Sequence, residues 1–131
     1  MSEEIAKQWL TGAVNTVAQK DLGAHMGMIS KRVSLQGVPG FDNIGYDSWF
    51  AQCEHEFKNN VIKSVAYKSL KLITDTDSQI LLKTYETVVG TDGTVNEQGV
   101  EMMLEKEDDG VWRLVQERVM PVYEAIRDQL I

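Results

Sequence analysis

The 131-residue sequence contains a single cysteine, two prolines and no long hydrophobic run. Cys53 cannot form a disulfide within the chain, and a lone cysteine suits a reducing compartment, so we expect a cytoplasmic protein. No apolar stretch approaches the roughly 20 residues that cross a bilayer. The N-terminal segment MSEEIAKQWL opens with acidic residues, unlike a signal peptide. These absences argue against a membrane protein or a secreted protein.

Basic residues are also scarce and scattered. The chain has 13 lysines and arginines against 20 acidic residues, for a net charge of -7, and KR at 31–32 is the only adjacent basic pair. Proteins that bind nucleic acid usually present a basic face to the phosphates. We therefore expect no binding to nucleic acid or to an anionic membrane.

The residues that hold metals and common cofactors are missing as well. Two histidines 30 residues apart and one cysteine have no recognised metal-ligand spacing. The sequence contains neither a glycine-rich phosphate loop nor a Gly-x-Ser-x-Gly nucleophile motif. The sequence thus predicts no metal and no cofactor.

What remains is a globular composition, 43% hydrophobic and 25% charged, which indicates one domain over residues 1–131. Apolar residues recur every four positions in 3–20 and predict a helix. Asp21 is expected to cap a second, short helix that carries His25 on its apolar face. A third helix follows the loop that ends at Gly45. The apolar positions of the first and third helices are Ile5, Trp9, Ala13, Val17, Tyr46, Trp49, Phe50, Cys53 and Phe57.

From residue 60 the apolar period changes to two, which is typical of strands. We expect strands at 61–73, 79–89, 100–107 and 111–120, after an earlier short strand that begins near residue 31. A last helical turn or two follows Pro121. The order predicts an α+β fold, α-α-β-α-β-β-β-β, with helices packed on one face of a curved antiparallel sheet.

This order resembles the nuclear transport factor 2-like (cystatin-like α+β) superfamily. The entry GYDSW to the third helix and the hairpin EDDGVWRLVQER add to the likeness, which is nearest in pattern to small polyketide cyclase-like (SnoaL-like) proteins and covers nearly the whole chain. The resemblance implies a cone-shaped fold with a central pocket. The superfamily includes ketosteroid isomerases, dehydratases, epoxide hydrolases, polyketide cyclases and non-catalytic association domains, so the fold does not decide the function.

The stretch after the second helix departs from the pattern of many catalytic members. Those proteins place an acidic residue there, at the start of the first strand, whereas MISKRVSL has Ser30 and Lys31. This difference argues against an isomerase-like or cyclase-like base at that position.

The last hairpin carries a carboxylate among apolar residues. If Asp109 and Gly110 form a two-residue turn, Leu104 faces Val115 and Met102 faces Glu117. Apart from Glu117, the face shared by these residues is apolar.

The preceding turn predicts the register of the two strands that it joins. With Asp92 and Gly93 at its centre, Lys83 faces Met102 and Tyr85 faces Val100. Lys83, Tyr85 and Glu117 would then share a face within roughly 10 Å. A register shift by one residue would move the residues of the earlier strand to the other face.

Glu117 and His25 each have a structural and a functional interpretation. Glu117 either pairs with Lys83 or reaches solvent, or it lines a pocket where burial raises its pKa into the range that suits proton transfer. His25 is either a buried residue satisfied by the backbone or a base held by Asp21, four residues earlier. The catalytic candidates are His25, Tyr85 and Glu117. The ligand-binding candidates are Tyr46 and Trp49, at the pocket mouth by analogy with the superfamily, and Lys83 and Met102.

Two kinds of function fit these residues. The first is a cofactor-free isomerase, dehydratase, cyclase or hydrolase that acts on a small apolar, polyketide-like or steroid-like molecule. The second is a non-catalytic module for ligand binding or association. We also expect a homodimer through the outer face of the sheet, because large exposed apolar patches mark partner surfaces and the superfamily resemblance points the same way. The apolar residues assigned to that face are Ile80, Leu82, Val88, Met103, Leu114 and Met120.

Overall fold

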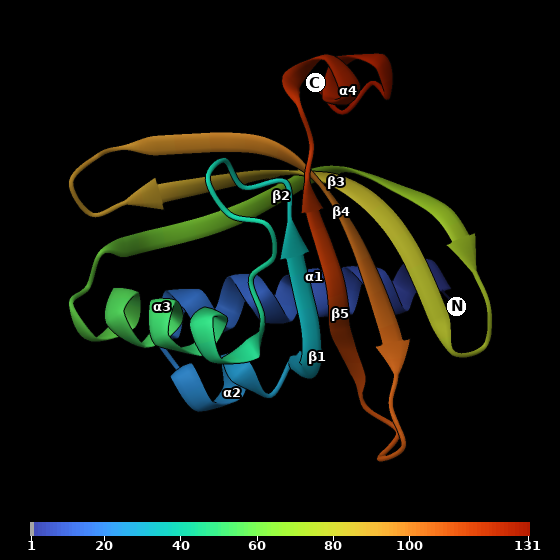
Figure 1. Ribbon diagram of the computed structural model, residues 1–131, viewed down its shortest axis with the longest axis horizontal. Coiled ribbons are helices and arrows are strands. Elements are labelled where there is room, and N and C mark those ends of the chain that lie inside the picture. The colour runs from blue at the N-terminus through green and yellow to red at the C-terminus, as the bar shows by residue number, and fades with distance from the viewer. Residues whose placement is uncertain (1) are drawn as a thin grey trace.

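The order of helices and strands is the one that the sequence predicts. The structure is a computed structural model that describes residues 2–131. Three helices and one strand come first, then four long strands and a short C-terminal helix (Figure 1). The elements are α1 (Ser2–Gln19), α2 (Leu22–Met26), β1 (Ile29–Gln36), α3 (Tyr46–Lys58), β2 (Ile62–Asp75), β3 (Gln79–Gly90), β4 (Val95–Lys106), β5 (Trp112–Val119) and α4 (Val122–Arg127).

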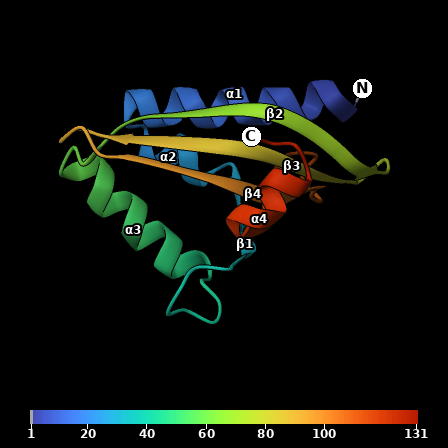
Figure 2. The same cartoon turned by 90° about the horizontal axis from the view of Figure 1, so that it is seen from above.

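The five strands form one sheet in the order β1-β5-β4-β3-β2. β1 runs parallel to β5, and the other neighbouring pairs are antiparallel. Viewed from above, α1 runs alongside β2 and α3 lies at an angle to it (Figure 2). α4 follows the end of β5 and contacts β4 (Figure 1). The predicted α+β architecture is confirmed. None of the described helices combines the length and the apolar composition that a membrane-spanning helix requires.

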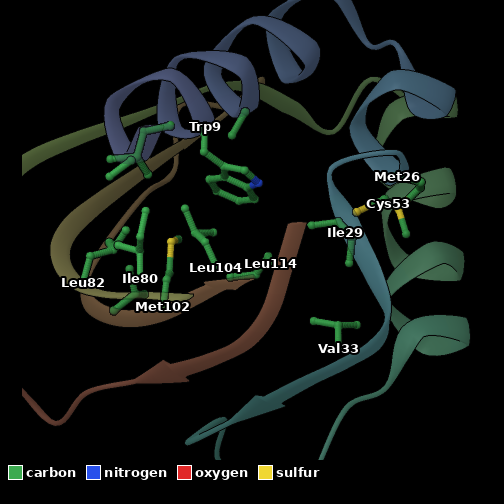
Figure 3. Close-up of a cluster of buried hydrophobic side chains, with 14 residues drawn as sticks. Trp9, Met26, Ile29, Val33, Cys53, Ile80, Leu82, Met102, Leu104 and Leu114 are labelled. Atoms are coloured by element: carbon green, nitrogen blue, oxygen red, sulfur yellow. The ribbon is translucent and has the colours of Figure 1, made fainter. Parts of the chain in front are cut away.

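The main core lies between α1 and the inner face of the sheet. Trp9 points from α1 toward Met102 and Leu104 on β4 (Figure 3). Its indole Nε1 donates a hydrogen bond to the carbonyl oxygen of Met28, 3.2 Å away. Met102 is only 1% exposed, so this ligand-binding candidate belongs to the packed core.

The turn between β3 and β4 is longer than the sequence predicted. Gly90 and Thr94 are joined by a hydrogen bond of 2.8 Å across a three-residue loop, and Gly93 has a φ of 89°. A type I turn followed by a left-handed glycine is a common three-residue hairpin loop. The extra residue shifts the register by one, so that Lys83 lies opposite Glu101 and Tyr85 opposite Gly99. The predicted pairings of Lys83 with Met102 and of Tyr85 with Val100 are therefore wrong.

The β4–β5 hairpin has the same kind of loop, closed by Glu107 and Val111, with Gly110 at a φ of 83°. Leu104 therefore pairs with Leu114, and the predicted pairing with Val115 is wrong. A β-bulge at the next step on β5 takes up one residue and restores the register. The predicted pairing of Met102 with Glu117 is confirmed. The longer loop shifts the register by one residue, and the β-bulge shifts it back by one residue before this pair.

The outer face of the sheet also differs from the prediction. Ile80, Leu82 and Leu114 are fully buried in the inner core, so they cannot contribute to an exposed apolar face. Part of the outer face is covered by the chain itself. Met120 and Tyr85 form a second apolar cluster with Ala125 and Leu130, which come from α4 and the residues after it.

Gly99 on β4 allows α4 to pack closely against the sheet, because glycine has no side chain. A Cβ atom placed there would lie 3.0 Å from the Cβ of Ala125. Lys83 holds the same segment through ion pairs with Asp128 (2.7 Å) and Glu124 (3.7 Å). The outer face at this point is thus occupied by the C-terminal segment.

Candidate functional site

Glu117 is the most unusual side chain on the inner face. It is 7% exposed, and it has no hydrogen bond or ion pair with any residue of the described range 2–131. Burial raises its pKa well above the ordinary 4.5, and the negative charge of Glu86 raises it further. Lys83 lies on the opposite face, so the predicted ion pair between Lys83 and Glu117 is wrong.

Glu86, on β3, lies near enough to Glu117 for its charge to act on that carboxyl. The register places Tyr67, Glu86 and Gln98 in one row across β2, β3 and β4. The phenol of Tyr67 donates to Oε2 of Glu86 and the amide of Gln98 donates to Oε1, each at 3.1 Å. Burial raises the pKa of Glu86, and these two hydrogen bonds oppose that rise.

Tyr67 completes the cluster. Burial raises its pKa well above 10.0, and the charges of Glu86 and then Glu117 add to this effect. Tyr67 and Glu86 are nevertheless only half-buried by surface area. The three side chains form a polar cluster, Tyr67–Glu86–Glu117, on a mostly apolar face.

The sequence predicts Glu117 opposite Met102 on the inner face, as the strand pairing confirms, but it does not predict Glu86 and Tyr67 on that face. Tyr85 was proposed in place of Glu86 because the β3–β4 register was one residue off. The missed signal lay in the apolar residues of β3: Ile80 and Leu82 are large, and placing them outside left them without cover. Had they been assigned to the core, Glu86 would have followed on the same face, since side chains alternate along a strand.

His25 lies at the edge of this region. Its Nδ1 is 2.8 Å from the hydroxyl of Thr16, and its ring centroid is 5.5 Å from that of Phe57. Because Thr16 also donates to the carbonyl oxygen of Ala13 (3.2 Å), we assign the imidazole proton to Nδ1 and the free lone pair to Nε2. Burial lowers the pKa of His25, which favours the neutral ring.

The partner of His25 differs from the one predicted. The carboxylate of Asp21 accepts a hydrogen bond from the backbone N–H of Ala24 (3.1 Å), as a helix cap, and Thr16 takes its place beside the imidazole. Within residues 2–131 no hydrogen bond joins His25 to Glu117. His25 and Tyr67 do pack against the same apolar cluster around Phe57.

Ser30 occupies the position where many superfamily members carry an acid. It is fully buried, and its hydroxyl donates to Oε2 of Glu107, 2.8 Å away. Burial would raise the pKa of Glu107, but hydrogen bonds from Ser30, Arg113 and Arg32 outweigh it and lower the pKa. The carboxylate of Glu107 is therefore ionised, and it accepts hydrogen bonds from Ser30, Arg113 and Arg32.

Tyr46 and Trp49 both come from the first turn of α3. They are half-buried and pack against the main core. Tyr46 lines a surface groove of about 640 Å³ beside the Ser30–Glu107 pair. The other groove-lining residues are Gly23, Met26, Gly27, Ile29, Ser30, Lys31, Arg32, Phe50, Glu107, Asp109 and Arg113.

Comparison with known proteins supports the architecture. No protein-family model matches the sequence, and a search of curated proteins finds no match. Solved structures do match. A nuclear transport factor 2-like protein from Shewanella oneidensis aligns with a TM-score of 0.74 and 16% identity, over 91% of this chain and 98% of the other.

Two further matches concern proteins with a stated activity or ligand. A candidate scytalone dehydratase from Novosphingobium aromaticivorans has a TM-score of 0.74 and 8% identity, over 89% of this chain and 81% of the other. A protein from Catenulispora acidiphila, in complex with S-DNPA, has a TM-score of 0.72 and 16% identity, over 95% and 96%. At these identities the likeness establishes the fold, which in this chain is the nuclear transport factor 2-like, or cystatin-like, fold.

Proposed function

We propose that this protein binds a small apolar molecule against the inner face of its sheet and acts on it through acid–base chemistry, without a cofactor, in the cytoplasm. The reaction would be that of an isomerase, dehydratase, cyclase or hydrolase. The observation that carries the proposal is Glu117, a buried carboxyl with no partner among residues 2–131 and with Glu86 and Tyr67 nearby.

Apolar surroundings without a hydrogen-bond donor from the protein disfavour the ionised form of a carboxyl, because few interactions with water remain to stabilise the charge. Glu117 is in this situation, although its oxygens keep some contact with solvent, since no side-chain oxygen of residues 2–131 is fully buried without a partner. Strongly shifted carboxyls of this kind are concentrated at functional sites. A pKa raised toward neutrality also suits a group that gives and takes protons. His25, neutral with a free Nε2, is proposed as a second proton-handling residue.

The matched structures add support of a general kind. One of them is a candidate dehydratase and another was solved with a small molecule, so the fold accommodates both activity and binding. The alternative is a passive binding or association module. The Ser30–Glu107 pair favours it, because the acid expected after α2 is absent and the nearby carboxylate is fully paired.

An uncharged probe with an enolisable ketone distinguishes these functions. We expect 2-acetylnaphthalene to bind in calorimetry and to exchange its methyl protons for deuterium in D₂O, as followed by proton NMR. Exchange requires removal of a proton from the carbon next to the carbonyl and return of a deuteron. Glu117→Gln should abolish exchange, while Glu54→Gln, at an exposed position of α3, should not. Binding without exchange would support the passive module, and no binding would overturn the proposal.

We also propose a homodimer through the outer face of the sheet, with a surface revised from the sequence prediction. α4 presents Val122 and Tyr123, each 69% exposed, and Ile126, 58% exposed. Exposed apolar side chains grouped in this way commonly mark a partner surface. Light scattering should give about twice the chain mass of 14.8 kDa, and Ile126→Lys should reduce it toward one chain. A wild-type monomer at high concentration would contradict the dimer.

A further inference from the structure

The groove of about 640 Å³ beside the Ser30–Glu107 pair shares no residue with the polar cluster Tyr67–Glu86–Glu117. It lies where α2, the start of β1 and the start of α3 come together at one end of the molecule (Figure 1). Small-molecule sites usually have volumes of about 300–1,000 Å³. The groove is therefore large enough for a small organic molecule.

One side of the groove is apolar and carries two aromatic rings. Tyr46 and Phe50 lie about one helical turn apart on α3, and their ring centroids are 6.2 Å apart with an angle of 49° between the planes. Both rings are half-buried. Met26 and Ile29, which are 5% and 2% exposed, also line the groove. Aromatic rings and a thioether favour contact with a flat aromatic molecule.

The carboxylates on the other side of the groove are already paired with Arg113. Its Nη1 donates to Glu107 at 3.1 Å and to Asp109 at 2.9 Å, and its Nη2 lies 2.8 Å from the second oxygen of Asp109. Its Nε donates to the carbonyl oxygen of Gly27, 2.8 Å away. These contacts hold the β4–β5 hairpin against the end of α2 and neutralise both carboxylates.

Two other cations of the groove keep free donors. Lys31 is exposed on β1, and its side chain has no ion pair or hydrogen bond within residues 2–131. Arg32 uses only Nη2, which contacts Glu105 at 2.7 Å and Glu107 at 3.2 Å, so its Nε and Nη1 have no partner in the same range. The lining has three cations and two carboxylates, and Glu105 brings the local sum to zero, against -7 for the chain. An anion therefore finds free donors here without the repulsion that the net charge implies elsewhere.

We propose that this groove binds a small aromatic monocarboxylate, with the carboxylate between Lys31 and Arg32 and the ring against Tyr46 and Phe50. A guanidinium offers a carboxylate two parallel N–H donors, and an ammonium adds another. The site goes beyond the proposed acid–base function, because none of its residues belongs to the proton-handling candidates. Its charged end lies at the outer face of the sheet, since Glu105 alternates with the inner-face residues of β4.

The site is tested with 2-naphthoate and 2-naphthamide, which share one aromatic body and differ in charge. In calorimetry we expect 2-naphthoate to bind about tenfold more tightly, because the amide lacks the charge-assisted hydrogen bonds. Lys31→Gln should weaken 2-naphthoate and leave 2-naphthamide unchanged. The control is Lys63→Gln, which removes the same charge from an exposed position of β2, at the opposite edge of the sheet, and should change neither affinity. Equal affinities for the two probes, or equal losses in the two variants, would overturn the proposal.

Proton–nitrogen correlation NMR locates the bound acid. The backbone signals of Gly27, Lys31 and Tyr46 should shift when 2-naphthoate is added, and those of Glu86 and Glu117 should stay in place. Shifts centred on Glu86 and Glu117, or no binding of 2-naphthoate at millimolar concentration, would overturn the proposal. The deuterium exchange of 2-acetylnaphthalene reports on the inner face, so the groove and the proposed function stand or fail separately.

Discussion

Replacing Glu117 by glutamine should stabilise the protein at neutral pH. Glutamine has nearly the shape of a protonated glutamic acid and never ionises. Burial and the charge on Glu86 raise the pKa of Glu117 in the folded protein, so the folded protein holds this proton to a higher pH than the unfolded chain does. The unfolded chain releases that proton above its ordinary pKa of 4.5. The wild-type protein therefore loses stability as pH rises from about 4.5 toward the folded-state pKa, and the variant does not.

The size of the effect at pH 7 has an upper limit. Each pH unit between 4.5 and the folded-state pKa removes about 1.36 kcal/mol, so the loss at pH 7 cannot exceed about 3.4 kcal/mol. The amide of glutamine has unmet hydrogen bonds of its own, which cost about as much as those of the neutral acid. We expect a gain of about 1–3 kcal/mol in the free energy of unfolding at pH 7. Near pH 4 the two proteins should be equally stable.

Urea denaturation followed by tryptophan fluorescence, repeated between pH 4 and pH 8, measures this gain. The slope of the free energy against urea should be the same in both proteins, which would show that the unfolded states are alike. Glu54→Gln, at an exposed position, is the control and should stay within about 0.5 kcal/mol of the wild-type protein. A loss of stability in Glu117→Gln at pH 7, or a gain that does not vary with pH, would refute the reasoning.

Three further substitutions test the fold around the site. Gly37→Ala should cost more than about 1 kcal/mol in thermal unfolding, because Gly37 has a φ of 85° and a Cβ there would lie 2.3 Å from the carbonyl oxygen of Val119. Gly99→Val should speed hydrogen exchange in α4, because the new side chain would press on Ala125; unchanged protection would show that α4 does not depend on this contact. Leu82→Ala should cost about 2–5 kcal/mol in urea unfolding, because Leu82 is fully buried in the main core, and a smaller loss would contradict that placement.

Local patterns in the sequence were sufficient for the architecture. The four-residue period of α1, the cap at Asp21 and the two-residue period after residue 60 each reflect interactions between near neighbours in the chain. They predict the order of elements, because an amphipathic segment has one regular structure that buries its apolar side. The pairing of Met102 with Glu117 was also predicted correctly, although through two shifts that cancel.

Strand register could not be read from the turns alone. An Asp-Gly pair fits the centre of a two-residue turn and also the end of a three-residue loop, and the two differ by one residue in register. In β3 this difference exchanges Glu86 for Tyr85 on the inner face. Which of the two loops forms depends on which face of the sheet α1 covers. That contact joins segments far apart in the sequence, so the turn residues do not reveal it.

The sequence by itself determined the fold class, the helical and strand segments and the presence of a carboxyl among apolar residues at position 117. Only the tertiary structure decided that this carboxyl has Glu86 and Tyr67 for neighbours and that Lys83 is held elsewhere by Asp128. Secondary structure depends on the period of side chains along one segment. The charge environment of Glu117 depends on which strands a curved sheet brings together, and that follows from packing across the whole chain.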